Sequence, residues 1–154
     1  PVSIRDHAPN VLQPAILSNG AVGTWLTRLS DDHGITAVAL DAASPDTLID
    51  TLFLRMLTRR PTEEERTSYR EYLGECFDKR VRVSTSAAKP KRTYEPFVSW
   101  SNHLDGEATL VRQAQESAAR RGDPPTERLD PKWRGRLEDV LWAMVNSSEF
   151  VFSP

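Results

Sequence analysis

Residues 44–80 read SPDTLIDTLFLRMLTRRPTEEERTSYREYLGECFDKR and predict two consecutive helices. Ser44 is a favourable N-cap, Pro45 suits the first helical position, and Asp46 complements the positive end of the helix dipole. Apolar residues then cover more than half of the helix circumference, so we expect this helix to be central. They are Leu48, Ile49, Leu52, Phe53, Leu54, Met56 and Leu57.

The second helix of this stretch follows directly on Arg59-Arg60-Pro61, which ends the first. Thr62 and Glu65 form a capping box, in which each side chain accepts a hydrogen bond from the other residue's backbone amide. Because the connection is short, we expect the two helices to form a central antiparallel hairpin. The residues expected on the buried face of the second helix are Tyr69, Tyr72, Leu73, Cys76 and Phe77.

A third strong helix signal begins at Asp130 and Pro131, an N-cap followed by a proline at the first helical position. Its apolar residues are Trp133, Leu137, Val140, Leu141, Met144 and Val145. If Trp142 is also buried, its replacement by Ala costs ~3–5 kcal/mol, whereas a loss below about 1 kcal/mol marks a surface position. We expect Phe150 and Phe152 to close the domain.

The remaining segments give weaker patterns. Residues 11–19 predict a short helix that ends at Asn19-Gly20, and apolar positions at 22, 25, 26 and 29 predict a second. Residues 35–40 fit strand or helix, and we favour helix. A mostly polar helix is expected from Asp105 to Gly122. Residues 81–99 read as a long loop, mobile around 84–92.

Together these patterns predict an all-α fold, an irregular bundle of five to seven helices around the central hairpin, with one long loop. We expect residues 1–154 to form a single helical domain. The formal net charge of −2 gives no global attraction to nucleic acid, and no apolar run approaches the roughly 18 residues of a membrane span. Because the first residue is Pro1, we expect the chain to be a piece of a longer polypeptide.

Catalytic and metal-binding patterns are absent from the sequence. The three histidines, His7, His33 and His103, are far apart, and one cysteine, Cys76, excludes an intrachain disulfide. We expect Cys76 to act as a small buried apolar group. The sequence lacks a nucleophile elbow, a phosphate-binding glycine loop and a haem attachment motif. We therefore assign no catalytic residue, no metal ligand and no cofactor to this chain.

Two segments are candidates for binding. Lys89, Lys91 and Arg92 belong to a cationic stretch that fits a polyanion or an acidic partner surface, although a solvated loop explains it more simply. Trp100, Asn102 and His103 combine an aromatic plane with amide and imidazole groups, as a polysaccharide-binding surface requires. The simpler interpretation, which we favour, is that Trp100 anchors the loop to the core.

Four segments carry a resemblance to a known family. They are residues 52–65 (LFLRMLTRRPTEEE), 100–104 (WSNHL), 121–126 (RGDPPT) and 138–150 (EDVLWAMVNSSEF). In register, they resemble the C-terminal domain of unknown function of the planctomycete cytochrome-c-domain-containing proteins. The resemblance implies the C-terminal part of an exported, multidomain bacterial protein that is extracytoplasmic, at the periplasm or cell surface. Haem is implied only for absent upstream domains, since the attachment motif is missing here.

These observations lead to one main functional hypothesis and two alternatives. The main hypothesis is a non-enzymatic structural or interaction module whose partners are the upstream domains of the parent protein. The first alternative is a domain that binds polysaccharide or another ligand around Trp100–His103. The second alternative is a helper domain that completes an active site together with those upstream domains.

Overall fold

The computed structural model describes residues 20–82 and 97–151, and every regular element in these two ranges is helical. This confirms the predicted all-α class, with seven α-helices in the described ranges. They are α2 (Ala21–Thr27), α3 (Gly34–Asp41), α4 (Pro45–Met56), α5 (Glu63–Gly74), α6 (Ala108–Arg121), α7 (Pro131–Val145) and α8 (Ser148–Val151), with a short 3₁₀ turn η1 (Phe77–Lys79) after α5. The helix predicted over 11–19 and Phe152 lie outside the described residues.

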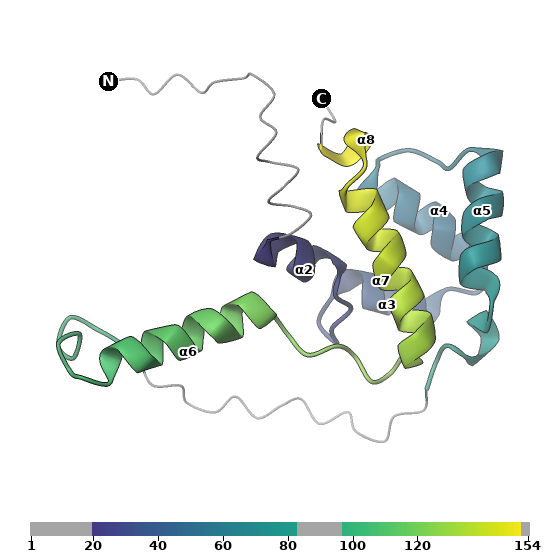
Figure 1. The fold of residues 1–154 in the computed structure, drawn as a ribbon. Helices are drawn as coiled ribbons and strands as arrows, with labels where there is room; N and C mark the ends of the chain where they lie inside the picture. The colour runs from purple at the N-terminus through teal and green to yellow at the C-terminus, as the bar shows by residue number, and fades with distance from the viewer. Residues whose placement is uncertain (1–19, 83–96, 152–154) are drawn as a thin grey trace, which may run out of the picture.

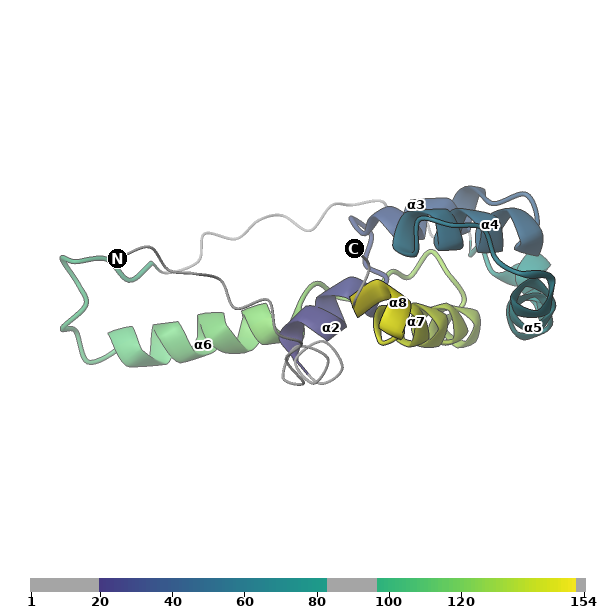
Figure 2. The same cartoon turned by 90° about the horizontal axis from the view of Figure 1, so that it is seen from above.

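The helices form a core with one arm. In Figure 1, α7 runs through the middle of the core, with α2 beside it and α5 on its other flank. Figure 2 shows α3 and α4 in one layer and α2, α7 and α5 in the other. Helix α6 extends away from both layers in the two views, and its C-terminal end lies near α2.

The structure contains the predicted N-caps. Each cap bonds to amides only two or three residues away, so the local sequence is enough to predict it. Ser44 Oγ accepts a hydrogen bond from the Thr47 amide at 3.2 Å. The Thr62 hydroxyl accepts from the Glu65 amide at 3.3 Å, while Glu65 accepts from the Thr62 amide at 2.7 Å. Asp130 accepts from the Trp133 amide at 3.2 Å. Residues 35–40 are helical, as favoured, whereas α6 begins three residues after the expected Asp105.

The core is built where α7 meets α5 and the segments that flank it. All six apolar residues predicted to be buried on α7 are buried. Trp133 is the largest of them, and its indole N–H donates to the Leu73 carbonyl at 2.9 Å. The Phe77 ring meets Trp133 edge-on at 5.9 Å between centroids. Burying each such side chain contributes about 1.5–3 kcal/mol, so this helix is a main source of stability.

Helices α4 and α5 pack against each other through one aromatic contact and two ion pairs. Phe53 and Tyr69 meet edge-on at 5.4 Å, Asp46 binds Arg70 at 2.7 Å, and Asp50 binds Arg66 at 2.8 Å. The earlier residue of α4 therefore pairs with the later residue of α5, and the later residue of α4 pairs with the earlier residue of α5. Figure 1 nevertheless draws the two axes oblique to each other, and the predicted antiparallel alignment of the pair stays a prediction.

Several residues that we expected in the core are exposed. Tyr72 is 44% exposed, although its hydroxyl donates to Asp139 of α7 at 3.2 Å, and Leu54 is also exposed. Trp142, whose burial the sequence left open, is 50% exposed. Cys76 is exposed as well. It lies beyond the end of α5, in a left-handed conformation with φ of 61°, so it does not continue the buried face of the helix. The expectation that Cys76 is a buried apolar group is wrong.

Arg80 is the main polar group inside the core. Its guanidinium donates to the Ala39 carbonyl at 2.7 Å and to the Ala42 carbonyl at 2.6 Å, at the C-terminal end of α3. It also lies 3.8 Å from the centre of the Phe77 ring. Desolvation by burial lowers the pKa of this guanidinium. Arg80 thus caps the C-terminal end of a neighbouring helix from within the core.

Candidate functional site

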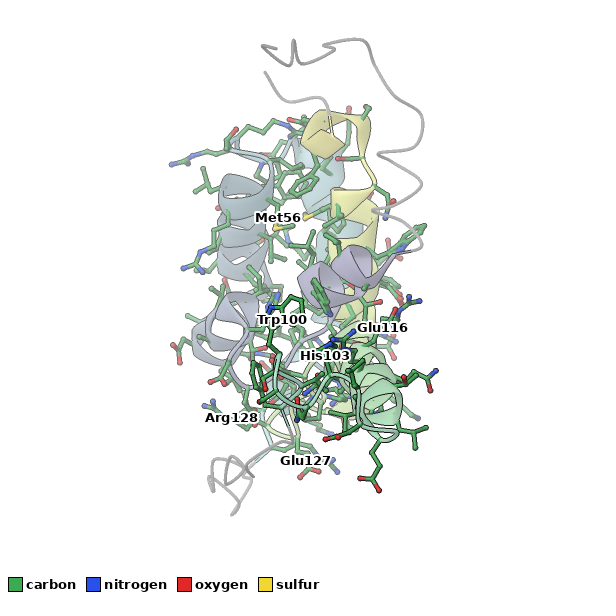
Figure 3. All side chains as sticks on the ribbon, turned by 90° about the vertical axis from the view of Figure 1, so that its left-hand side faces the viewer. Met56, Trp100, His103, Glu116, Glu127 and Arg128 are labelled. Atoms are coloured by element: carbon green, nitrogen blue, oxygen red, sulfur yellow. The ribbon has the colours of Figure 1, made fainter. Side chains whose placement is uncertain are left out.

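The arm ends in a loop of residues 97–107, here called the tip loop, which connects to the start of α6. Figure 3 looks at the arm from its end and shows Trp100 and His103 together on this loop. Within α6, only Ala108 is buried, whereas Leu110 is 64% exposed. The tip loop therefore stands apart from the core, and its side chains face solvent or one another.

Asn102 shapes the tip loop from inside. Its side-chain oxygen accepts a hydrogen bond from the Ser99 amide at 2.6 Å, and its side-chain amide donates to the Phe97 carbonyl at 2.8 Å. Asparagine side chains commonly close turns in this way. Both ends of the Asn102 amide are thus engaged within the loop, and its role here is to hold the turn.

Trp100 and His103 form a pair on the surface of this turn. Their rings meet edge-on, with centroids 4.9 Å apart, and His103 Nδ1 lies 2.6 Å from the Trp100 carbonyl oxygen. The Trp100 side chain is 89% exposed. The interpretation that it anchors the loop to the core is therefore wrong. The turn instead presents the indole in a fixed orientation to solvent.

A hollow of about 480 Å³ lies beside this pair. It is lined by Phe97, Val98, Ser99, Trp100, His103 and Arg112. The structure thus brings together Trp100, Asn102 and His103, three of the six binding residues that the sequence suggested. The other three, Lys89, Lys91 and Arg92, lie outside the described residues.

A second concave region, here called the α2–α6 cleft, was not predicted. It has a volume of about 540 Å³, and the residues that line it include Trp25, Arg28, Asp32, His33, Ala119 and Asp123. They come from two segments about 90 residues apart, so no local sequence pattern links them. The sequence assigned Trp25 to an apolar helical stripe, but the structure places this half-exposed indole on the wall of the cleft.

The two walls of the cleft are joined by specific contacts. The Trp25 indole N–H donates to the Ala119 carbonyl at 2.8 Å, and Arg28 donates to the Arg121 carbonyl. Gly122 has a φ of +65°, and a Cβ atom there would lie 2.9 Å from Trp25 Cδ1. Only glycine tolerates both the backbone conformation and the close approach of the indole. The cleft is therefore a built feature of the fold.

Two carboxyl groups with a lowered pKa lie at the junction of α5 and α8. There, Arg59 binds Glu65 at 2.7 Å and Glu149 at 2.5 Å. Side-chain hydrogen bonds from Arg59 lower the pKa of Glu65 to about 2 and also lower the pKa of Glu149. The cluster holds α8 against the start of α5.

Comparisons with protein-family models, curated proteins and solved structures find no match for this chain. Within the described ranges, no group of three or more His, Cys, Asp or Glu side chains is arranged to hold a metal ion. Nor does any helix there have the length and apolar character needed to cross a membrane.

Proposed function

We propose that the chain is a non-enzymatic interaction module of a larger exported bacterial protein, and that the tip loop is its contact surface. The observation that supports this proposal is the exposure of large apolar side chains on and beside the loop. Phe97 is 69% exposed, Trp100 89%, Leu104 87% and Leu110 64%. Clustered exposed apolar residues of this kind mark interaction sites on protein surfaces.

The physical basis is the burial that a partner provides. Each large apolar side chain removed from water contributes about 1.5–3 kcal/mol, and aromatic residues are enriched at the centres of protein interfaces. The hydrogen bonds of Asn102 fix the loop before binding, which reduces the entropy lost on association. The partner in this proposal is an upstream domain of the parent protein, a location and context that rest on the family resemblance.

The experiment is a calorimetric titration of residues 1–154 against the upstream part of the parent protein. We expect Trp100→Ala and Leu104→Ser to weaken association by about tenfold or more, as loss of a buried anchor does. Leu54→Ser is the matched control, because Leu54 is also exposed but lies on α4 in the core. Equal affinity of the tip-loop variants and the wild-type chain, or absence of association, would contradict the proposal.

The hollow beside Trp100 favours a second candidate function, binding of polysaccharide. An exposed indole next to an imidazole and the guanidinium of Arg112 offers one stacking face together with polar donors. Binding on a glycan array that is lost in Trp100→Ala, at an unchanged melting temperature, supports this function. An array that shows no binding at all removes it.

A further inference from the structure

The α2–α6 cleft carries chemistry that the interaction proposal does not use. Trp25 is 48% exposed, and its ring forms part of the cleft wall. Its indole N–H is already bonded to the Ala119 carbonyl, so the orientation of the ring is fixed. A fixed and accessible aromatic ring is a stacking surface for a flat, partly apolar ligand.

The hydrogen-bond donors of the cleft come from Arg28 and His33. Arg28 donates one N–H to the Arg121 carbonyl, and its guanidinium carries four more. His33 Nδ1 accepts from the Ile35 amide at 3.3 Å, as the N-cap of α3. In a neutral imidazole the proton must then be on Nε2, which makes this nitrogen a donor. The fold thereby sets the tautomer of a residue that lines the cleft.

The hydrogen-bond acceptors of the cleft are the carboxylates of Asp32 and Asp123. Both residues are exposed and line the cleft, and neither carboxylate has a hydrogen-bond or ion-pair partner among the described residues. Among the described lining residues, Arg28 is the one fixed cation against the two aspartates, so these residues together carry a net negative charge. This charge disfavours phosphates, sulfates and other anions.

We propose that the α2–α6 cleft is a binding site for a neutral saccharide. A sugar ring presents a C–H face that stacks on the Trp25 indole. Its hydroxyl groups both donate and accept, so they pair with the Asp32 and Asp123 carboxylates and with the Arg28 and His33 donors. The volume of about 540 Å³ lies within the usual range of small-molecule sites. This site does not depend on the tip loop or on its partner.

The test combines a glycan array with calorimetry on its best ligands, using neutral, acidic and amino oligosaccharides as probes. We expect neutral oligosaccharides to bind, and the double variant Asp32→Asn/Asp123→Asn to bind them about tenfold or more weakly, because charge-assisted hydrogen bonds are lost. The matched control is Asp41→Asn, an exposed aspartate at the end of α3 and outside the cleft. Trp100→Ala removes the indole of the tip loop, so oligosaccharide binding that persists in this variant does not come from the tip loop.

Three results would overturn the proposal. One is the absence of any neutral oligosaccharide among the bound probes. Another is equal affinity of the double variant and the wild-type chain. The third is loss of binding in Trp100→Ala alone, which would assign the sugar to the tip loop and leave the function proposed for that loop intact. Equal melting temperatures of the variants and the wild-type chain exclude unfolding as the cause of any loss.

Discussion

At the scale of single residues, the two tryptophans of α7 have opposite environments. Trp133 is 1% exposed and its indole N–H is bonded to Leu73, whereas Trp142 is 50% exposed. Trp133→Ala is expected to lower the free energy of unfolding by about 3–5 kcal/mol, because it leaves a cavity and an unpaired carbonyl. We predict that Trp142→Ala costs less than half as much. Urea denaturation followed by circular dichroism measures both values.

The variant Trp133→Phe provides the control for this comparison. Trp133→Phe retains most of the buried ring but loses the hydrogen bond to Leu73, so its cost should fall between zero and that of Trp133→Ala. Equal losses in the free energy of unfolding for the two alanine variants would show that Trp142 contributes as much to stability as Trp133, despite its exposure. A small loss for Trp142→Ala makes that indole a candidate binding residue.

Arg80 is a second residue whose importance is measurable. Arg80→Met removes a buried guanidinium and leaves the Ala39 and Ala42 carbonyls without their partner. Each unsatisfied buried group costs about 1–3 kcal/mol, so we expect a loss of roughly 3 kcal/mol or more. Arg80→Lys should recover only part of it, because one ammonium group cannot reach the same set of carbonyls.

Arg82→Met is the matched control for this measurement, read from the midpoint of urea denaturation. The Arg82 side chain is exposed, and the hydrogen bond that fixes the residue comes from its backbone amide to the Arg128 carbonyl. Arg82→Met should therefore change the midpoint of urea denaturation only slightly. An Arg80→Met variant as stable as the wild-type chain would show that apolar packing of the methionine side chain replaces the lost hydrogen bonds.

At the scale of elements, the Arg59 cluster makes the attachment of α8 depend on pH. Hydrogen bonds from Arg59 lower the pKa of Glu65 from its usual 4.5 to about 2. The stabilisation is therefore complete above pH 4.5 and is lost as the pH falls towards 2. We predict that Glu65→Gln is less stable than the wild-type chain at pH 6. The difference between the two should shrink between pH 4.5 and pH 2.

Glutamine is the informative replacement because it can still complete the capping box with Thr62. Denaturant midpoints measured at several pH values separate the ion pair from the cap. Glu64→Gln is the control, since Glu64 is exposed in the same helical turn and has no contact with Arg59. A difference between Glu65→Gln and the wild-type chain that is the same at pH 6 and pH 2 would show that the ion pair between Glu65 and Arg59 does not stabilise the fold.

The elements also show which features the sequence determines locally. The N-caps Ser44, Thr62 and Asp130 were predictable, because a cap bonds to amides two or three residues away in the same helix. The helix faces that are exposed to solvent were not predictable from the sequence in this way. Leu54 and Tyr72 are apolar enough to be buried, but how far a helix face is covered depends on which distant element packs against it.

At the scale of the whole molecule, the same limit explains why the α2–α6 cleft was missed. Trp25 reads as part of an apolar helical stripe, and Asp123 belongs to a segment far along the chain. They meet because Gly122 allows the chain to pass close to the indole, which no spacing rule predicts. Trp100, Asn102 and His103 were found because their relation lies within one short segment. Of the two concave regions, the local one was predictable and the one formed by distant segments was not.

The division into core and arm predicts an uneven resistance to local unfolding. Helices α4 and α7 carry most of the fully buried side chains, whereas α6 buries only Ala108. Amides open more readily where few apolar contacts must break. We therefore predict that hydrogen exchange, measured by mass spectrometry, is slowest in α4 and α7 and fastest among the helices in the first half of α6.

Protein concentration provides the control for this prediction. If the arm is free in solution, exchange in the first half of α6 stays fast when the concentration is raised, because no second molecule covers it. Exchange there that is as slow as in α7 at every concentration would contradict the separation of arm and core. Exchange that slows only at high concentration would show that the exposed residues Leu104 and Leu110 bind a second copy of the chain. The tip loop would then be an interaction surface whose partner is the protein itself.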